Sequence, residues 1–321
     1  MPADRLAPGA GNRQSIRMKH RLIFSAAAIL TLAAHLPARA SLDEIVAADA
    51  KVNQLGTGMK FTEGPVWIPA EKRLVWSDIP NSRQMQWTAK DGMSEWRKVE
   101  ASNGNLLDLE GNLLSCQHSG RNLISTDAKG KITVLVDKYD GKKFNSPNDL
   151  AVKSDGTIWF TDPTYGLRGK PGEIEERNVY HFDPATGKVT ILIDDFDMPN
   201  GIAFSPDEKV LYISDTGKGG KIRAFEVGAD GKSLGKELFK IDIRCDGMCI
   251  DVDGNVYTTA AGGIHVFDKG GKKLGLIETP EHPANVCFGG DDYKTLYITA
   301  RKSLYSVDVK KAGAKPEGAK W

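Results

Sequence analysis

The chain has 321 residues, of which 26% are charged and 40% hydrophobic, and its formal net charge at pH 7 is +1. Residues 1–40 hold six basic residues and one acidic residue, so the remaining 281 residues carry a formal net charge of −4. A mildly acidic chain without a stripe of Lys and Arg argues against nucleic acid as a partner. All-β folds commonly reach this size as one unit, so we expect a single domain over residues 41–321.

The N-terminal segment has the three parts of a secretory signal peptide. Residues 18–21 read Met-Lys-His-Arg, residues 22–32 are largely Leu, Ile, Phe and Ala, and residues 38–40 read Ala-Arg-Ala. We expect cleavage near Ala40/Ser41 and a periplasmic or secreted mature protein. The apolar run is too short to span a bilayer and no comparable run follows, so we expect a mature form without a membrane partner.

Two alternatives stay open for this segment. The apolar run could instead form a buried N-terminal helix, although a small-x-small site after such a run is hard to obtain otherwise. Translation could begin at Met1 or at Met18, and in the second case residues 1–17 would be an upstream extension.

The rest of the chain repeats one unit six times. The clearest copy is Ser146–Gly166, in which Leu150–Val152 and Thr157–Thr161 flank an Asp155-Gly156 turn, a strong hairpin signal. A repeat of about 40 to 50 residues with several strands per unit is typical of propeller blades. The sequence therefore predicts an all-β fold, a six-bladed β-propeller of four-stranded antiparallel blades. The turns of the six copies lie 39, 45, 52, 46 and 38 residues apart, at Glu71, Glu110, Asp155, Asp207, Asp253 and Asp291.

The two ends of the chain are predicted to meet in one blade. Each blade should continue with two outer strands, for example Val179–Phe182 and Val189–Ile193 in the third blade. The sixth blade has only Ser303–Val309 after its second strand and is one strand short. We expect Lys51–Phe61 to supply the missing strand, because this pairing hides an otherwise exposed edge.

One position repeats before the inner strand of each blade, where a propeller brings equivalent residues together at one end of its channel. Four of the six residues there carry carboxylate or amide oxygens, without Cys or His, and such a set suits a hard divalent cation. A single Asn or Asp before a strand is more often a turn residue, but coincidence in four blades favours a metal site. The six residues are Glu63, Gly104, Asn148, Asn200, Asp246 and Ala284.

The motifs around this position resemble those of the gluconolactonase/regucalcin (senescence marker protein) family of six-bladed propellers. The resemblance covers essentially all of residues 41–321. It implies that Glu63, Asn148, Asn200 and Asp246 bind one divalent metal, Ca²⁺ first, with Mg²⁺, Zn²⁺ or Mn²⁺ as alternatives. It also implies hydrolysis of sugar lactones similar to gluconolactone. The motifs are Thr62-Glu-Gly-Pro65, Ser146-Pro-Asn-Asp149, Met198-Pro-Asn-Gly-Ile-Ala-Phe-Ser-Pro-Asp207 and Asp246-Gly-Met-Cys-Ile-Asp251.

One departure bears on the substrate. Animal members of the family carry an arginine two residues before the first motif asparagine, where it contacts substrate, and this chain has Ser146 there. Together with Phe160–Gly166, this version is more similar to bacterial gluconolactonases. The substrate preference of the animal proteins is therefore not carried over, and by the same resemblance we expect Asn148 and Tyr165 to contact the lactone.

The predicted reaction needs a group that deprotonates water. Asp246 is the first choice for this general base, with one oxygen on the metal and the other toward the incoming water. Asp149 is the second choice, and its alternative role is to anchor the loop through backbone hydrogen bonds. His118, at the end of a predicted strand, is expected to contact sugar hydroxyls or to move a proton, with structural hydrogen bonding as the alternative.

Two other functions stay open. A related metal-dependent esterase or phosphotriesterase would share fold and metal and differ only at the pocket rim, which sequence does not resolve. A non-catalytic ligand-binding propeller would have little reason to gather two carboxylates and two amides at its axis. A serine hydrolase is not favoured, because the sequence contains no GxSxG motif before a strand-to-helix turn.

Three smaller points complete the predictions. Asp78, Asp162 and Asp215 follow second strands and are predicted to cap turns, with a structural cation as a minor alternative. The four cysteines are interpreted as small core residues with free thiols, while an exported chain would also permit disulfides. The oligomeric state, monomer or dimer, stays open.

Overall fold

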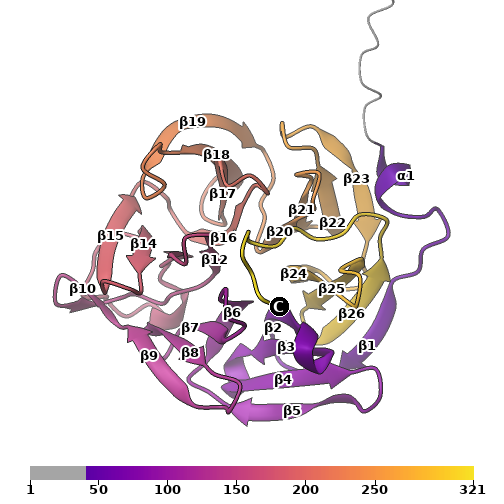
Figure 1. Cartoon of the computed structure of the whole chain (residues 1–321), viewed down its shortest axis with the longest axis horizontal. Coiled ribbons are helices and arrows are strands. Elements are labelled where there is room, and N and C mark those ends of the chain that lie inside the picture. Colours follow the sequence, from indigo (N-terminus) through magenta and orange to yellow (C-terminus); the bar gives the residue numbers. More distant parts are fainter. Residues whose placement is uncertain (1–40) are drawn as a thin grey trace, which may run out of the picture. The chain divides into compact units, whose positions relative to one another are not determined.

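A computed structural model of the protein describes residues 41–321, which form six four-stranded antiparallel sheets arranged around a central channel (Figure 1). The six-bladed propeller predicted from the repeat is confirmed. The predicted signal peptide and the two start positions lie outside the described residues. Among residues 41–321, no helix is long and apolar enough to cross a membrane.

The first three blades follow one another along the chain, each from its inner to its outer strand. The predicted outer strands of the third blade agree with the structure to within one residue at each end. Blade one comprises β2 (Thr62–Ile68), β3 (Arg73–Asp78), β4 (Arg83–Thr88) and β5 (Gly92–Lys98); blade two comprises β6 (Ser102–Leu107), β7 (Leu113–Gln117), β8 (Asn122–Thr126) and β9 (Ile132–Val136); blade three comprises β12 (Leu150–Val152), β13 (Ile158–Thr161), β14 (Val179–Asp183) and β15 (Lys188–Ile193).

The last three blades repeat this order, except that the sixth is completed from the N-terminal side. Its outermost strand is β1 (Asn53–Thr57), which pairs antiparallel with β26 and confirms the predicted closure of the ring. Blade four comprises β16 (Pro199–Phe204), β17 (Val210–Asp215), β18 (Lys221–Val227) and β19 (Leu234–Ile241); blade five comprises β20 (Met248–Ile250), β21 (Val256–Ala260), β22 (Gly263–Phe267) and β23 (Lys273–Glu278); blade six comprises β24 (Pro283–Gly289), β25 (Thr295–Ala300) and β26 (Ser303–Asp308) before β1.

Short elements fill the connections between the blade strands. The helix α1 lies beside the outer strand of blade five, and η3 belongs to the long connection after β13. Their bounds are α1 (Leu42–Ile45), η1 (Pro69–Glu71), η2 (Ile79–Asn81), η3 (Tyr165–Leu167), β10 (Lys138–Tyr139) and β11 (Lys142–Lys143).

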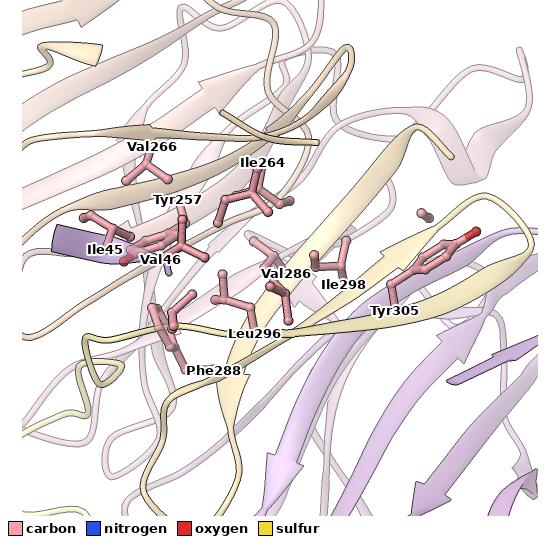
Figure 2. Close-up of a cluster of buried hydrophobic side chains, with 14 residues drawn as sticks. Ile45, Val46, Tyr257, Ile264, Val266, Val286, Phe288, Leu296, Ile298 and Tyr305 are labelled. Atoms are coloured by element: carbon pink, nitrogen blue, oxygen red, sulfur yellow. The ribbon is translucent and has the colours of Figure 1, made fainter. Parts of the chain in front are cut away.

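The hydrophobic core lies between neighbouring blades. Figure 2 shows the cluster between blades five and six. There the rings of Tyr257 and Phe288 pack in a T-shaped arrangement, with their centroids 5.1 Å apart. Ile45 and Val46, at the end of α1, pack onto this cluster. Fully burying one large apolar side chain stabilises a fold by roughly 1.5–3 kcal/mol. Many such contacts between blades hold the inner strands in a fixed ring.

Three aspartates fix the segments that lead into the inner strands. Asp78, Asp162 and Asp215 each accept hydrogen bonds from two successive backbone N–H groups that precede the inner strand of their own blade. The prediction that these aspartates cap backbone groups is thus confirmed. Each one lies at the end of the second strand of a blade and caps the segment that leads into the inner strand of the same blade. The donors are Lys60 and Phe61 for Asp78, Asn145 and Ser146 for Asp162, and Asp197 and Met198 for Asp215.

The C-terminal segment crosses the end of the channel where the inner strands finish (Figure 1). The Ala314 N–H donates to the Ile250 carbonyl at 2.9 Å, and the indole Nε1 of Trp321 donates to the Asp108 carbonyl at 2.6 Å. Between this segment and the other end lies a cavity of about 180 Å³, lined in part by Cys249. All four cysteines are free thiols, as expected for core residues.

Candidate metal centre at the channel mouth

The inner strands of the six blades all begin at one end of the central channel, which we call the channel mouth. Where they begin, strand pairing brings one residue of each blade to the same level. These six residues, which we call the mouth ring, are Glu63, Asn103, Asn148, Asn200, Asp246 and Ala284.

In the second blade the ring residue is Asn103, and the predicted alignment on Gly104 is wrong by one position. Ser102 pairs with the last residue of the second strand, as Thr62 does in blade one, so the residue after each is equivalent. Both inner strands then have an irregularity before regular pairing resumes. Blade four has the same irregularity, but its first regularly paired residue afterwards is Ile202, whereas blade two has the polar Asn105 there. An alignment on apolar residues is therefore displaced by one position in blade two. The structure thus gives the mouth ring a fifth oxygen-bearing side chain.

Glycine follows four of the ring residues because neighbouring blades approach too closely for a side chain. A Cβ on Gly104 would lie only 2.7 Å from the Asn148 carbonyl oxygen, well inside van der Waals contact. In each case the glycine approaches the backbone carbonyl of the ring residue in the next blade. Gly64 approaches the Asn103 carbonyl in this way, which confirms that Asn103 occupies the same level as the other ring residues. The equivalent contacts run from Gly64 to Asn103, from Gly201 to Asp246 and, as an N–H to carbonyl hydrogen bond, from Gly247 to Ala284.

Two carboxylates of the mouth ring are held in an unfavourable electrostatic environment. Burial raises the pKa of Glu63 well above its usual value, and the charges of Asp246 and Asp149 raise it further. Asp246 is half-buried as a residue, yet burial of its carboxyl raises its pKa to about 7, while the neighbouring Asn200 amide lowers it. Both shifts show that negative charge at the mouth is not compensated by the protein groups that act on it.

A divalent cation fits this donor set. Glu63 and Asp246 supply two negative charges, and the amides of Asn148 and Asn200 supply neutral oxygens, the ligand types that Ca²⁺ and Mg²⁺ prefer. In the described part of the chain, no group of three or more His, Cys, Asp or Glu side chains is placed to hold a metal ion. The cation would therefore depend on the asparagine oxygens as well as on the two carboxylates.

A second polar layer lies one residue below the mouth ring, where the other four blades have glycine. Asp149 and Asn285 occupy this layer, and the Asn285 Nδ2 donates to Asp149 Oδ2 at 3.3 Å across the channel. The backbone N–H of Leu150 donates to the other oxygen of Asp149 at 3.0 Å. Burial raises the pKa of Asp149 to about 7 despite these two hydrogen bonds. Both oxygens of Asp149 are thus engaged with the protein, as expected for a loop anchor.

The two ring asparagines predicted as ligands are buried and have a fixed backbone. Asn148 is 3% and Asn200 is 4% exposed. The Asn148 N–H donates to Thr161 at 2.9 Å, and its carbonyl accepts from Gly104 at 2.8 Å. The Asn200 carbonyl accepts from the Thr161 hydroxyl at 2.7 Å. With the backbone engaged on both sides, neither asparagine can leave the mouth without breaking inter-strand hydrogen bonds.

Tyr165 and His118 flank the mouth ring from different sides. Tyr165 lies on η3, is 42% exposed, and its hydroxyl hydrogen-bonds to Thr216. His118 is buried, and its Nε2 accepts from the Asn103 Nδ2 at 3.0 Å. Burial, and to a smaller degree the charge of Arg168, lowers the pKa of His118 to about 4. A contact of either side chain with a sugar stays a prediction, and His118 is already used as a structural hydrogen-bond acceptor.

Two polar residues at the mouth were not predicted from the sequence: Asn103 and Asn285. A signal for the first was present, because an acidic or amide residue followed by glycine occurs at Glu63-Gly64, Asn103-Gly104, Asn200-Gly201 and Asp246-Gly247. Aligning this dipeptide, rather than the hydrophobic residues after it, gives the observed ring residue in blade two. Asn285 follows Ala284 and has no such signal.

Over most of its length, the chain is similar in sequence to known proteins. Residues 61–302 match the family described as SMP-30/Gluconolactonase/LRE-like region. A gluconolactonase of Zymomonas mobilis is 31% identical over 303 residues, which cover 85% of each protein.

Solved structures agree with this comparison. A gluconolactonase of Xanthomonas campestris has a TM-score of 0.78 and 35% identity, over 84% of this chain and 92% of that one. A calcium-binding regucalcin of Agrobacterium tumefaciens shares the fold, with a TM-score of 0.71 and 23% identity over 83% of this chain and 97% of that one. The chain therefore belongs to the SMP-30/gluconolactonase/LRE-like family.

Proposed function

We propose that the protein is a divalent-metal-dependent lactonase that hydrolyses sugar lactones at the channel mouth. The observation that carries this proposal is the mouth ring, which brings the carboxylates Glu63 and Asp246 to one level of the channel, where burial raises the pKa of both. The groups that act on the pKa of Glu63 are two carboxylates, a backbone N–H and an amide. A bound cation would supply the missing positive charge.

The cation would be held by Glu63, Asn148, Asn200 and Asp246. Ca²⁺ is the first candidate because it accepts neutral amide oxygens together with carboxylates in irregular geometry, with Mg²⁺, Zn²⁺ or Mn²⁺ as alternatives. We also propose that the mature protein is periplasmic or secreted, on the basis of the signal-peptide pattern in residues 1–40. Millimolar calcium outside the cytoplasm would suit a site of modest affinity.

The chemistry divides between the cation and the side chains. When bound, a divalent cation polarises a carbonyl group and stabilises negative charge that develops on its oxygen. Asp246 would hold the cation through one carboxylate oxygen and would take the proton of the attacking water with the other. The water oxygen bonds to the lactone carbonyl carbon, the ring C–O bond breaks, and the proton passes from Asp246 to the leaving oxygen.

Asp149 is the weaker candidate for the base. Its two carboxyl oxygens accept hydrogen bonds from Leu150 and Asn285, so it would have to give up one of them to bind water. We assign it the role of holding the layer beneath the mouth ring. Its charge also adds to the negative potential that raises the pKa of Glu63.

A sugar lactone is the proposed substrate, since the similar proteins from Zymomonas mobilis and Xanthomonas campestris are both gluconolactonases. The rim next to the mouth ring includes Tyr165, which is partly exposed, and the polar backbone of η3. We propose that Tyr165 and Asn148 contact the substrate hydroxyl groups. His118 contributes indirectly, through its hydrogen bond to Asn103.

The test measures the hydrolysis of glucono-δ-lactone. The acid released is titrated with base at constant pH, and the rate of spontaneous hydrolysis is subtracted. We expect the metal-loaded protein to accelerate ring opening, a chelator to abolish the acceleration, and added Ca²⁺ to restore it. Aryl esters and phosphotriesters are assayed beside the sugar lactones. Turnover of phosphotriesters without turnover of any lactone would replace lactonase by the related metal-dependent hydrolase. No metal-dependent turnover in any class would reject the proposal.

A further inference from the structure

We propose that Asn103 supplies a further oxygen ligand to the cation at the mouth ring, and that His118 is the positioning residue that orients its amide. This inference rests on the proposed metal site and adds a ligand to it. Three features of the structure support it: the level of Asn103 in the channel, the hydrogen bonds of its amide, and the burial of its carbonyl oxygen.

The first feature is the level. Asn103 follows Ser102 as Glu63 follows Thr62, and both pairs start their inner strands with the same pairing to the second strand. The glycine of blade one packs against the Asn103 carbonyl, as Gly201 packs against that of Asp246. Asn103 therefore occupies the position in blade two that the proposed ligands occupy in their own blades.

The second feature is the way the residue is held. The Asn103 backbone carbonyl accepts hydrogen bonds from Ser77 Oγ at 2.7 Å and from Asn105 Nδ2 at 2.9 Å. The side-chain Nδ2 donates to His118 Nε2 at 3.0 Å. Because an amide nitrogen can only donate, this bond turns the Oδ1 atom away from the imidazole. The orientation of the amide is thus set by His118 and leaves the oxygen free for another partner.

The third feature is the unpaired oxygen. Asn103 is 3% exposed, and its Oδ1 is buried without a hydrogen-bond partner among the described residues. A buried carbonyl oxygen without a partner is costly, and such a group in a native fold requires an explanation. A carbonyl oxygen without a donor beside it is the kind of group that a hard cation accepts as a ligand. Because Asn103 lies at the level of the proposed ligands, we assign its oxygen to the cation.

A matched control lies in blade three. Asn178 is fully buried, its Nδ2 donates to the Tyr180 hydroxyl at 2.8 Å, and its Oδ1 also lacks a partner among residues 41–321. Asn178 directly precedes β14, the third strand of its blade, and is not part of the mouth ring. Replacing it removes the same kind of buried amide without touching the proposed ligands.

The experiment is calorimetric titration of the metal-free protein with CaCl₂, for the wild type and for the variants Asn103→Ala, Asn103→Asp and Asn178→Ala. We expect Asn103→Ala to weaken Ca²⁺ binding by about 10- to 100-fold, the size of effect known for groups that shape a metal site. Asn103→Asp should bind Ca²⁺ at least threefold more tightly, since a carboxylate replaces the amide oxygen. Asn178→Ala should bind as the wild type does.

A second measurement tests the positioning role. We expect His118→Leu to weaken Ca²⁺ binding less than Asn103→Ala does, and to add nothing further in the Asn103→Ala background, because its effect passes through the amide. Additive effects of the two substitutions would overturn the role of His118.

The outcomes separate the two proposals. A wild type that binds neither Ca²⁺ nor Mg²⁺, Zn²⁺ or Mn²⁺ rejects the metal site and with it the proposed function. A wild type that binds Ca²⁺ together with an Asn103→Ala variant that binds equally well, within twofold, rejects only the role of Asn103. If Asn103→Ala does not fold, Asn103→Asp decides: tighter binding supports the ligand, and unchanged or weaker binding overturns it.

Discussion

The two ends of the central channel are built by the same six inner strands, but they differ in how far the protein pairs or neutralises the polar groups there. At the mouth, Glu63, Asp246 and Asn103 present oxygens that the protein leaves uncompensated, by charge or by hydrogen bonds. At the other end, the C-terminal segment supplies partners to the ends of the inner strands, as in the hydrogen bond from Ala314 to Ile250. One end is open to a ligand, and the other is completed by the chain itself.

The difference follows from where each strand begins and ends. Close packing between blades requires glycine after four of the ring residues, so only Asp149 and Asn285 carry side chains one level below the ring. Where the strands finish, the channel contains apolar side chains and the cavity of about 180 Å³. Carboxylates without a compensating charge therefore lie at the mouth, where binding of a cation can repay the cost of desolvating them.

The largest effect should come from removing a ring carboxylate. We expect Asp246→Ala to lower kcat/KM for glucono-δ-lactone by about 10³-fold, within the range found for loss of a general base. The metal-free variant should be at least as stable as the wild type, because the substitution removes a charge that raises the pKa of Glu63. Asp308→Asn, at the exposed end of β26, serves as the control. Wild-type activity in Asp246→Ala would remove this residue from the mechanism.

Next in size is the effect of filling the space between two blades at the mouth. Gly201 packs against the Asp246 carbonyl, and its backbone conformation would itself accept an alanine, so Gly201→Ala tests steric contact alone. We expect a loss of about 3 kcal/mol in the free energy of unfolding, the upper range for overpacking, together with weaker activity. Gly270→Ala, in an exposed turn, is the matched control and should leave both unchanged. Denaturant unfolding followed by fluorescence measures the difference.

The C-terminal end can be tested by opening it. Cys249 and Cys287 line the cavity between the Asp149/Asn285 layer and the C-terminal segment, and burial raises the pKa of both thiols. A chain shortened to end at Lys311 should expose them, and we expect a thiol reagent to label them about tenfold faster than in the full chain. Lactonase activity should persist, since the mouth ring is untouched. Equal labelling rates would show that the C-terminal segment does not close the channel.

The sequence predicted this division of the channel only in part. Strand periodicity and turn spacing were sufficient for six blades and for closure by β1, because both depend on local hydrogen bonding and edge pairing. Five of the six ring residues were also predicted. Asn103 was missed because Asn105 is polar where blade four has Ile202, so an alignment on apolar residues is displaced by one position. The Asn103-Gly104 dipeptide carries the register, but the close approach of blades that requires its glycine is visible only in the assembled ring.

The C-terminal segment was not predicted to close the channel for a different physical reason. Residues 310–321 read Lys-Lys-Ala-Gly-Ala-Lys-Pro-Glu-Gly-Ala-Lys-Trp, which has neither the period of a strand nor that of a helix. Its position is set by scattered hydrogen bonds, such as that from Lys320 N to Leu109 O, and by stacking of Trp321 near Tyr293. Contacts of this kind become visible only once the ring is assembled.

The smallest effect should come from one hydrogen bond at the closed end. Trp321→Phe keeps an aromatic ring beside Tyr293 but removes the donor to the Asp108 carbonyl, an interaction at 2.6 Å. We expect the free energy of unfolding to fall by about 1 kcal/mol, the usual net contribution of one hydrogen bond, with kcat and KM unchanged. Thermal unfolding and initial-rate kinetics on the same samples measure both quantities. A drop in kcat would mean that the two ends are energetically coupled through the inner strands, and the closed end would then belong to the working site.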